Sequence, residues 1–455
     1  MHDFQVGEEQ LPVNDRPPTR HPRRAVLTRL FFAALAMTSL VGWCHRGLVR
    51  PLSAIDEVAW GDFGTFYMAG YSALHGHDLY DLKHTRALAR TLGMRRGPPE
   101  FCYPPHIALL FMPVAAVLTP AEAAVVSVVS NAILYWAAVF LLFWGLSFPR
   151  SATALGVAVI AAASYAPSWE TIGTGQVNIV VLLFVVVGLV AYERERWARS
   201  GASLGVAAVV KLFPGATAIQ LLADRKTRAL GVMIGVGLAV LCVSVAVLGP
   251  GPFERYLRNE LPKNAGLVHA GANDVSLNSF VSRVSGAGTS PGDSSVAAQH
   301  ASNVSRLLRI AVFLVSGLLA VVPSRNSTAL PFDRMCLLLI AAMIVNAWTW
   351  TEHLVVALPA IAVVTRRMPA LPRPAYRCVV AGVALSYGLM ALSFHVPVYK
   401  HGSMLVRELV RSSSLNLYGL GLLWMTLALR ILIRQRGATS SSPDSPCGFG
   451  QKQPK

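Results

Sequence analysis

The sequence predicts an all-α polytopic membrane protein with about ten to twelve transmembrane helices and outer loops that carry amphipathic helices. Of the 455 residues, 54% are hydrophobic and only 14% are charged, whereas roughly a quarter of the residues in a soluble domain are charged. The mean hydropathy is +0.49. Apolar runs such as 25–43, 229–248 and 415–433 are long enough to cross a hydrocarbon core of roughly 30 Å. A single signal peptide cannot account for them.

The formal net charge of +17 is concentrated in short basic clusters beside the apolar runs. The positive-inside rule explains this distribution more simply than nucleic-acid binding, so no nucleic-acid partner is expected. The clusters expected in the cytoplasm are 20–24, 193–199, 224–228, 366–377 and the C-terminal run from Arg430. Both chain ends are therefore expected in the cytoplasm.

The elements follow from this alternation of apolar and polar segments. Residues 1–24 and 437–455 are predicted to be disordered cytoplasmic tails, and residues 25–436 form the membrane domain. Long outer loops are expected at 46–103 and 249–304, and shorter ones at 168–176, 348–353 and 395–414. The predicted crossings are 27–45, 122–146, 152–167, 176–191, 229–248, 305–322, 335–347, 354–365, 378–394 and 414–433.

Two apolar segments, 104–119 and 201–222, do not fit this order as simple spans. Pro104-Pro105 opens the first, and Lys211 and Pro214 lie in the middle of the second. Counting both as full spans would place the cluster at 193–199 outside, against the charge rule. We therefore expect both segments to be broken or re-entrant.

The six cysteines show neither CxxC nor Cys/His ligand spacing, so the sequence indicates no zinc site. Cys44 and Cys102 bracket the first outer loop and could pair in an oxidising periplasm. No acidic cluster resembles an octahedral cation site either. Neither a metal nor a cofactor is expected.

The first outer loop contains the most informative stretch, WGDFGTFYMAGYSALHGHDLYD at 60–81. Its helical spacing predicts a helix that starts at Asp62, stops at Gly76 and lies in the membrane interface with its apolar face down. Asp62 is either an N-cap for this helix or a general base. Asp56 and Glu57 could replace it in either role. The residues that set the spacing are Phe63, Phe66, Tyr67, Gly70, Tyr71 and Leu74.

Sugar transfer from a polyprenyl phosphate would need a carboxylate to take the acceptor's proton and cations to stabilise the leaving phosphate. No Ser or Cys nucleophile constellation competes with this chemistry. For each basic candidate, an interfacial, snorkelling or headgroup-binding role is the alternative. The candidates are Arg258, Lys263, His269, His353 and, if its broken helix opens to a cavity, Lys211.

Two further motifs place polar groups at the ends of spans. GTGQVN at 173–178 carries two amides and two glycines, which indicates either helix capping with close packing or hydrogen bonding to sugar hydroxyls. Glu352 and His353, in WTWTEHL, place an acid and an imidazole at the outer mouth. Ionisable groups there are costly unless they are paired or wetted.

In this order, DFGTFYMAGYSALHGHDLYD, YPP, GTGQVN, KLFP, NDVSLNSF and WTWTEHLVV resemble glycosyltransferase family 87 over most of residues 55–365. This family belongs to the GT-C superfamily of membrane transferases and is typified by polyprenol-phosphate-mannose-dependent α-1,2-mannosyltransferases. The resemblance implies a GT-C-like bundle and an inverting, direct-displacement reaction in which Asp62 is the general base.

The resemblance also implies a set of sugar-, acceptor- and donor-binding side chains. Related proteins often have a His-His pair where this chain has Glu352 and His353, which makes His353 the better phosphate partner. The residues that the resemblance places around the donor pocket are Tyr103, Gln176, Asn178, Glu352 and His353. Tyr67 is a further candidate for binding the sugar or the acceptor.

The leading hypothesis is therefore a membrane enzyme that moves a hexose, mannose by family resemblance, from a polyprenyl-phosphate donor to a glycolipid or cell-envelope glycan. Its site would face the periplasm from a bacterial inner membrane. One alternative is a transporter or flippase for a lipid-linked saccharide, with the broken helices as its path. Another is an O-antigen-ligase-like transferase that uses Arg255, Arg258 and Lys263 as diphosphate clamps.

Overall fold

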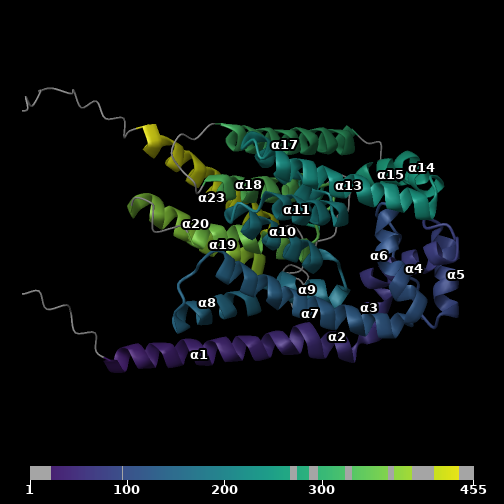
Figure 1. The fold of residues 1–455 in the computed structure, drawn as a ribbon, viewed down its shortest axis with the longest axis horizontal. Coiled ribbons are helices and arrows are strands. Elements are labelled where there is room, and N and C mark those ends of the chain that lie inside the picture. The colour runs from purple at the N-terminus through teal and green to yellow at the C-terminus, as the bar shows by residue number, and fades with distance from the viewer. Residues whose placement is uncertain are drawn as a thin grey trace, which may run out of the picture.

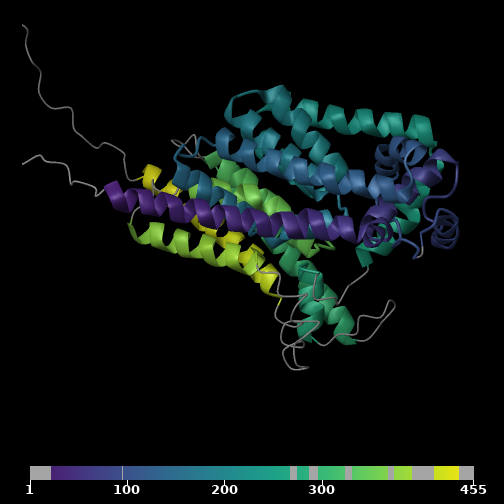
Figure 2. The same ribbon diagram turned by 90° about the horizontal axis from the view of Figure 1, so that it is seen from below.

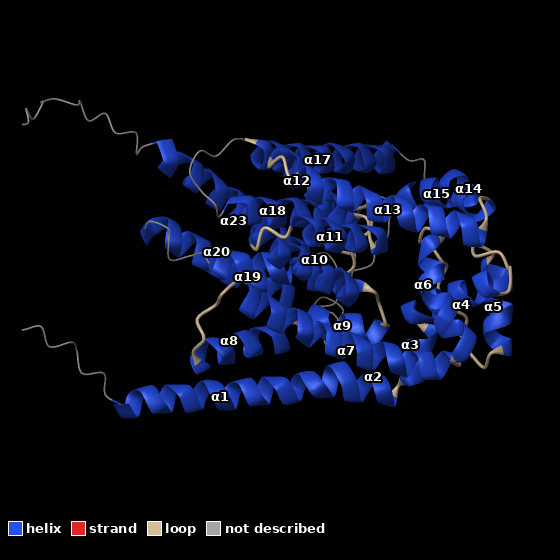
Figure 3. Cartoon of the chain, in the orientation of Figure 1, coloured by secondary structure: helices blue, strands red, loops and turns tan. Residues whose placement is uncertain are grey.

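The protein is an all-helical membrane protein, as the sequence predicts. The computed structural model describes residues 22–94, 96–266, 274–285, 296–322, 330–366, 373–391 and 414–439. In these ranges the chain forms helices and no strand, apart from an isolated antiparallel bridge between Asp274 and Trp350 (Figures 1 and 3). Most of both predicted tails lies outside the described residues.

The helices fall into three groups in chain order. The first group comprises α1 (Pro22–Cys44), η1 (His45–Val49), α2 (Arg50–Ser53), α3 (Ile55–Trp60), α4 (Asp62–Leu74), α5 (Leu82–Thr91), α6 (His106–Val117), α7 (Pro120–Gly145), α8 (Ala152–Ala163) and α9 (Ala166–Thr174). The second comprises α10 (Asn178–Glu193), α11 (Trp197–Val210), η2 (Phe213–Ala216), α12 (Thr217–Ala223), α13 (Thr227–Leu248), α14 (Gly251–Arg255), η3 (Tyr256–Glu260) and α15 (Leu261–Gly266). The third comprises α16 (Leu277–Ser285), α17 (Val296–Val321), α18 (Leu330–Val345), η4 (Thr351–Ala357), α19 (Leu358–Arg366), α20 (Arg373–Ala391) and α23 (Leu415–Thr439).

Five helices in the described part of the chain are long and apolar enough to cross a membrane. α8 and α9 become a sixth span if this pair, bent by 47°, is counted as one. The other predicted crossings fall on shorter or less apolar helices, so the number of ten to twelve stays a prediction. The long helices run roughly along one axis, with α1 at the edge of the bundle (Figures 1 and 2). The five candidate spans are Val26–Ser53, Pro120–Gly145, Thr227–Leu248, Gln299–Val321 and Leu415–Gln435.

The break predicted in the segment 201–222 is present. α11 ends at Val210, Lys211 has extended backbone angles, and a 3-10 turn with Pro214 in it leads into α12. Proline lacks the N–H that would continue the helical hydrogen-bond ladder, which explains why the helix does not run on. The interruption places a lysine side chain and non-helical backbone in the interior of the protein.

The helix predicted after Asp62 exists, but it is buried rather than laid on a membrane surface. Phe66 and Met68 of α4 are 0% exposed, so its side chains are covered by protein. A Cβ atom at Gly70 would lie 2.5 Å from the carbonyl carbon of Phe111, which shows how closely α6 approaches. The helical spacing predicts that only one face of α4 is covered. The glycines of α4 instead let neighbouring helices approach closely, so that most of its other side chains are covered as well.

The described parts of the two long loops predicted to be outside, 46–103 and 249–304, form a cap at the end of the bundle opposite the start of α1 and the end of α23 (Figure 1). α3, α4 and α5 of the first loop lie there beside α14 and α15 of the second. Ion pairs join the two loops: Arg255 pairs with Asp78, and Lys263 pairs with Glu100. The two loops are therefore docked on each other at this end of the bundle.

At the opposite end, α18 and α23 are joined by charges. Arg430 and Asp333 are both 0% exposed, and the Nε atom of Arg430 donates to Asp333 Oδ2 at 3.1 Å. Arg434 donates to the same oxygen at 3.1 Å. A buried charge needs such partners, because an isolated one would be strongly destabilising.

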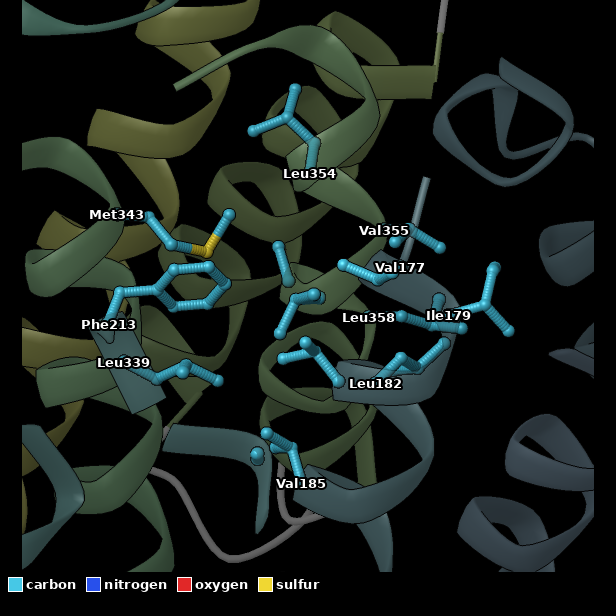
Figure 4. Close-up of a cluster of buried hydrophobic side chains, with 14 of the residues drawn as sticks. Val177, Ile179, Leu182, Val185, Phe213, Leu339, Met343, Leu354, Val355 and Leu358 are labelled. Carbon is cyan, nitrogen blue, oxygen red and sulfur yellow. The ribbon is translucent and has the colours of Figure 1, made fainter. Parts of the chain in front are cut away.

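A buried apolar cluster lies in the core of the helix bundle (Figure 4). It is formed by α10, η2, α18, η4 and α19, and its members are almost completely buried. The segments that supply three of the predicted site residues continue directly into it: Gln176 precedes Val177, His353 precedes Leu354, and Lys211 lies two residues before Phe213. Polar side chains are thus anchored by apolar neighbours in the sequence.

Candidate active site

Asp62 is the first residue of α4, at the end of the bundle where the outer loops lie. Gly61 occupies the N-cap position, so the interpretation of Asp62 as the cap is not what the structure shows. Its side chain is half-buried and lies within hydrogen-bonding reach of Gln176. Burial raises the pKa of Asp62 from its ordinary value of 3.8, while the bond to Gln176 and the charge of Lys211 lower it in part.

The turn after α9 brings Gln176 to Asp62. Gly175 has φ +69°, and the N–H groups of Gly175 and Gln176 donate to the carbonyls of Ile172 and Thr171 at 3.1 Å each. This is the Schellman arrangement, in which a left-handed glycine closes a helix. The capping interpretation of GTGQVN is therefore right for its glycine, and the same turn aims the Gln176 side chain at the site.

Tyr103 lies on the other side of Gln176. Its hydroxyl donates to Gln176 Oε1 at 3.4 Å, and its ring packs against Phe66 with a centroid distance of 4.9 Å. The Nζ atom of Lys211 lies 5.8 Å from the centroid of the same ring, within cation–π range. One tyrosine therefore contacts both the amide and the cation of the site.

Lys211 and His353 are in direct contact, although they are 142 positions apart in the sequence. Lys211 Nζ lies 2.6 Å from His353 Nε2, and both side chains are buried. The backbone N–H of Trp350 points at the other ring nitrogen, Nδ1, at 3.4 Å. The Lys211 ammonium donates to Nε2 in the ring tautomer that leaves this nitrogen unprotonated.

Glu352 adds a second carboxylate to this group. Its side chain is buried, and it interacts electrostatically with both Asp62 and Lys211. Thr171 donates to its backbone carbonyl at 2.8 Å, which ties η4 to α9. The cluster thus holds one lysine between two carboxylates, an arrangement that can accept a proton and stabilise a bound anion.

Asp274 orders the backbone that leads to Glu352. Its Oδ1 accepts hydrogen bonds from the backbone N–H groups of Ser276 at 2.9 Å and Thr349 at 3.4 Å. The backbone N–H of Val275 donates to the carbonyl of Thr349 at 2.6 Å. The motif NDVSLNSF therefore has a structural role, because Asp274 and Val275 hold the extended start of WTWTEHL in place.

Cys102 is a neighbour of the site that the sequence interpretation missed. It interacts electrostatically with Lys211 and Asp62, and burial raises the pKa of its thiol to about 11. Cys44 and Cys102 are both free, so they do not form a disulfide. The position next to Tyr103, in FCYPP, was the only signal that could have pointed to Cys102.

The other basic candidates are placed elsewhere. Arg258 pairs with Glu254 at 2.8 Å on the exposed surface of the cap, and Lys263 pairs with Glu100. Asp56 and Glu57 are not buried on α3. His269 lies outside the described residues.

Two candidates for sugar or acceptor binding, Tyr67 and Asn178, have surroundings other than the cluster around Lys211. The hydroxyl of Tyr67 donates to the carbonyl of Leu118 at 2.8 Å, so it is held by the connection between α6 and α7. The Asn178 side chain is fully buried, and its amide has no hydrogen-bond partner among the described residues. Within the same ranges, no group of three His, Cys, Asp or Glu side chains is placed to hold a metal ion.

Fold and site together define a class: a polytopic, all-helical membrane protein with acidic, amide and cationic side chains gathered beneath its outer loops. Residues 101–348 match glycosyltransferase family 87, and the chain belongs to this family. It resembles a polyprenol-phosphate-mannose-dependent α-(1-2)-phosphatidylinositol pentamannoside mannosyltransferase of Mycobacterium tuberculosis (strain CDC 1551 / Oshkosh), with 29% identity over 255 residues. The match covers 55% of this chain and 54% of that relative, so it spans about half of each. No solved structure shows a significant match.

Proposed function

We propose that the protein transfers a hexose, mannose by analogy with its relative, from a polyprenyl phosphate to a glycolipid or cell-envelope glycan. Family membership supports a glycosyltransferase, and the relative's name supports this donor class. The observation that carries the proposal is the convergence of Asp62, Lys211 and His353 from three distant parts of the chain. These side chains are a base, a cation and an imidazole in one place.

The proposed reaction is a single inverting displacement. Asp62 takes the proton of the acceptor hydroxyl, whose oxygen forms a bond to the anomeric carbon of the sugar. The bond from that carbon to the phosphate oxygen breaks, and its electron pair leaves with the polyprenyl phosphate. Lys211 and His353 hold this phosphate and stabilise the charge that develops on it. In this reaction Lys211 supplies the positive charge, so no metal ion is required.

Lys211 and His353 fit the phosphate better than Arg258 and Lys263 do. The latter two are exposed and already paired with carboxylates, and the attraction between exposed charges is weak. A buried ammonium acts in a lower dielectric and therefore interacts more strongly with an arriving anion. Tyr103, Asn178 and Glu352 remain the proposed sugar- or acceptor-facing groups, and Tyr67 remains a more distant candidate.

The orientation proposed for the site is outward, toward the periplasm of a bacterial inner membrane. The basic clusters favour cytoplasmic chain ends. The first outer loop, with α4, lies at the end of the bundle opposite both termini (Figure 1). A donor whose lipid tail stays in the bilayer can reach a site at the outer mouth without leaving the membrane.

The test is transfer by the purified protein in proteoliposomes with a membrane lipid extract. Polyprenyl-phosphate-[14C]mannose is compared with the corresponding glucose and arabinose donors, and labelled lipid or glycan products are counted. Label in an acceptor supports the proposal and identifies the sugar. If no donor gives transfer but labelled lipid moves between the leaflets, the transporter interpretation is correct, and the broken segment at Lys211 becomes its path.

A further inference from the structure

We infer that Gln176 is a positioning residue for Asp62: Tyr103 locks the Gln176 amide, and the amide NH₂ group holds the Asp62 carboxylate in place. This inference rests on the proposed role of Asp62 as general base. It gives Gln176 a role other than sugar binding, because its amide oxygen already accepts a hydrogen bond from Tyr103 and its side chain lies within reach of Asp62.

Backbone packing brings the turn with Gln176 against the start of α4. A Cβ atom at Gly61 would lie 3.9 Å from the carbonyl oxygen of Thr174. A Cβ atom at Gly175 would lie only 2.4 Å from the Cβ atom of Phe63. The residues on either side of Asp62 are thus in contact with the residues before Gln176. This close packing of the turn against the start of α4 holds Gln176 near Asp62.

The orientation of the amide follows from Tyr103. The tyrosine hydroxyl donates to Gln176 Oε1 at 3.4 Å, which leaves the NH₂ group to face Asp62. The reversed amide would place an oxygen acceptor against the Asp62 carboxylate, which cannot donate, and would lose that interaction. Tyr103 is itself fixed, because its backbone carbonyl accepts the hydroxyl of Tyr80 at 2.9 Å. The chain of contacts therefore runs from the first loop through Tyr103 and Gln176 to Asp62.

Other groups also act on Asp62, so the effect of Gln176 must be separated from theirs. Lys211 favours the ionised carboxylate, whereas Glu352 disfavours it. Cys102 and Tyr103 also lie within electrostatic range of Asp62, and His353 is in contact with Lys211. Substitution of Gln176 by leucine leaves all these charges in place and removes the interactions of the Gln176 amide with Asp62 and Tyr103.

The experiment measures kcat, KM and the pH dependence of kcat/KM for Gln176→Leu and Tyr103→Phe in proteoliposomes. A hydrogen bond to an ionised carboxylate is worth enough for Gln176→Leu to lower kcat by about tenfold to a hundredfold. The acid limb of the profile should move to higher pH by about one to two units, because the ionised form loses a donor. Tyr103→Phe keeps the ring and should give smaller changes in the same directions. The KM of Gln176→Leu should stay within about twofold.

Gln220 provides the matched control. It is also a fully buried glutamine, but both of its amide atoms lack hydrogen-bond partners in the described part of the chain. Gln220→Leu should leave the pH profile of transfer unchanged. This variant shows whether a buried Gln→Leu change affects the profile by itself.

Two results would overturn the inference. If Gln176→Leu raises KM for the donor and leaves the acid limb where it is, Gln176 binds sugar and does not position the base. If Gln176→Leu fails to fold, Tyr103→Phe serves as the test instead, and an unchanged acid limb in this variant would likewise show that Gln176 does not position the base. A separate variant identifies failure of the proposed function: full transfer by Asp62→Asn would show that Asp62 is not the base, whatever Gln176 does.

Discussion

Gly175 and Gly173 lie two residues apart, yet replacing each with alanine should have opposite effects on stability. Gly175 has φ +69°, a left-handed conformation that costs an alanine about 1–2 kcal/mol. Its new Cβ atom would also lie 2.4 Å from the Cβ atom of Phe63, and such overpacking costs about 1–3 kcal/mol. Gly175→Ala should therefore destabilise the protein by about 2–5 kcal/mol.

Gly173 lies inside α9, and the nearest atom to its added Cβ is Pro51 Cγ at 3.9 Å, an ordinary contact. Gly173→Ala should stabilise the protein by about 0.5–1 kcal/mol, because alanine loses less backbone entropy in a helix.

The assay is thermal unfolding in nanodiscs followed by tryptophan fluorescence, together with the transfer rate at 25 °C. Gly175→Ala should unfold at a lower temperature and lose transfer, since the strain acts on the turn that carries Gln176. Gly173→Ala should retain transfer and unfold at the wild-type temperature or above. Equal unfolding temperatures and equal transfer rates for the two variants would refute the packing described between this turn and α4.

Three further predictions concern charge. Because burial raises the pKa of Asp62, transfer should decline on acidification at a higher pH than an ordinary aspartate with pKa 3.8 would give, which a pH–rate profile of the wild type measures. Lys211→Met should lower the transfer rate by about a hundredfold to a thousandfold. Lys263→Met should retain most of the transfer activity, since exposed ion pairs contribute little. Equal losses in the two variants would instead assign phosphate binding to Lys263. Arg430→Leu should lower the free energy of unfolding by about 3–5 kcal/mol, because the buried Asp333 loses an ion-pair partner. Adding Asp333→Leu to this variant should recover part of that loss, and thermal unfolding measures both effects.

The sequence singles out most of the residues that the structure brings together in the proposed site, but it does not reveal their assembly. Helical spacing and flanking glycines predict α4, and the apolar, basic and proline patterns predict the break at Lys211. Hydrophobic patterns describe single segments, however, and no pattern in one sequence shows that Lys211 meets His353 across 142 positions. Only the docking of η2 against α18 and η4, around the apolar cluster of Figure 4, brings these residues together.

The sequence is a poorer guide to the basic residues and to the burial of α4. The outer-loop position of Arg258 and Lys263 suggests a phosphate role, but nearby carboxylates pair with both. The apolar side chains after Asp62 suggest a helix in the membrane interface. Close approach at Gly70 instead lets α6 cover it, and such an approach depends on tertiary packing that a helical period does not reveal.

The proposed mechanism depends above all on Asp62, which removes the acceptor's proton during transfer from a polyprenyl-phosphate sugar. The decisive measurement is the initial rate of labelled sugar transfer by the wild type and by Asp62→Asn, with both substrates saturating and folding verified by the unfolding temperature. Asparagine keeps the size of the side chain but cannot accept the proton as a carboxylate does, so the rate should fall by at least about a hundredfold. A folded Asp62→Asn variant that transfers sugar at the wild-type rate would show that Asp62 is not the base.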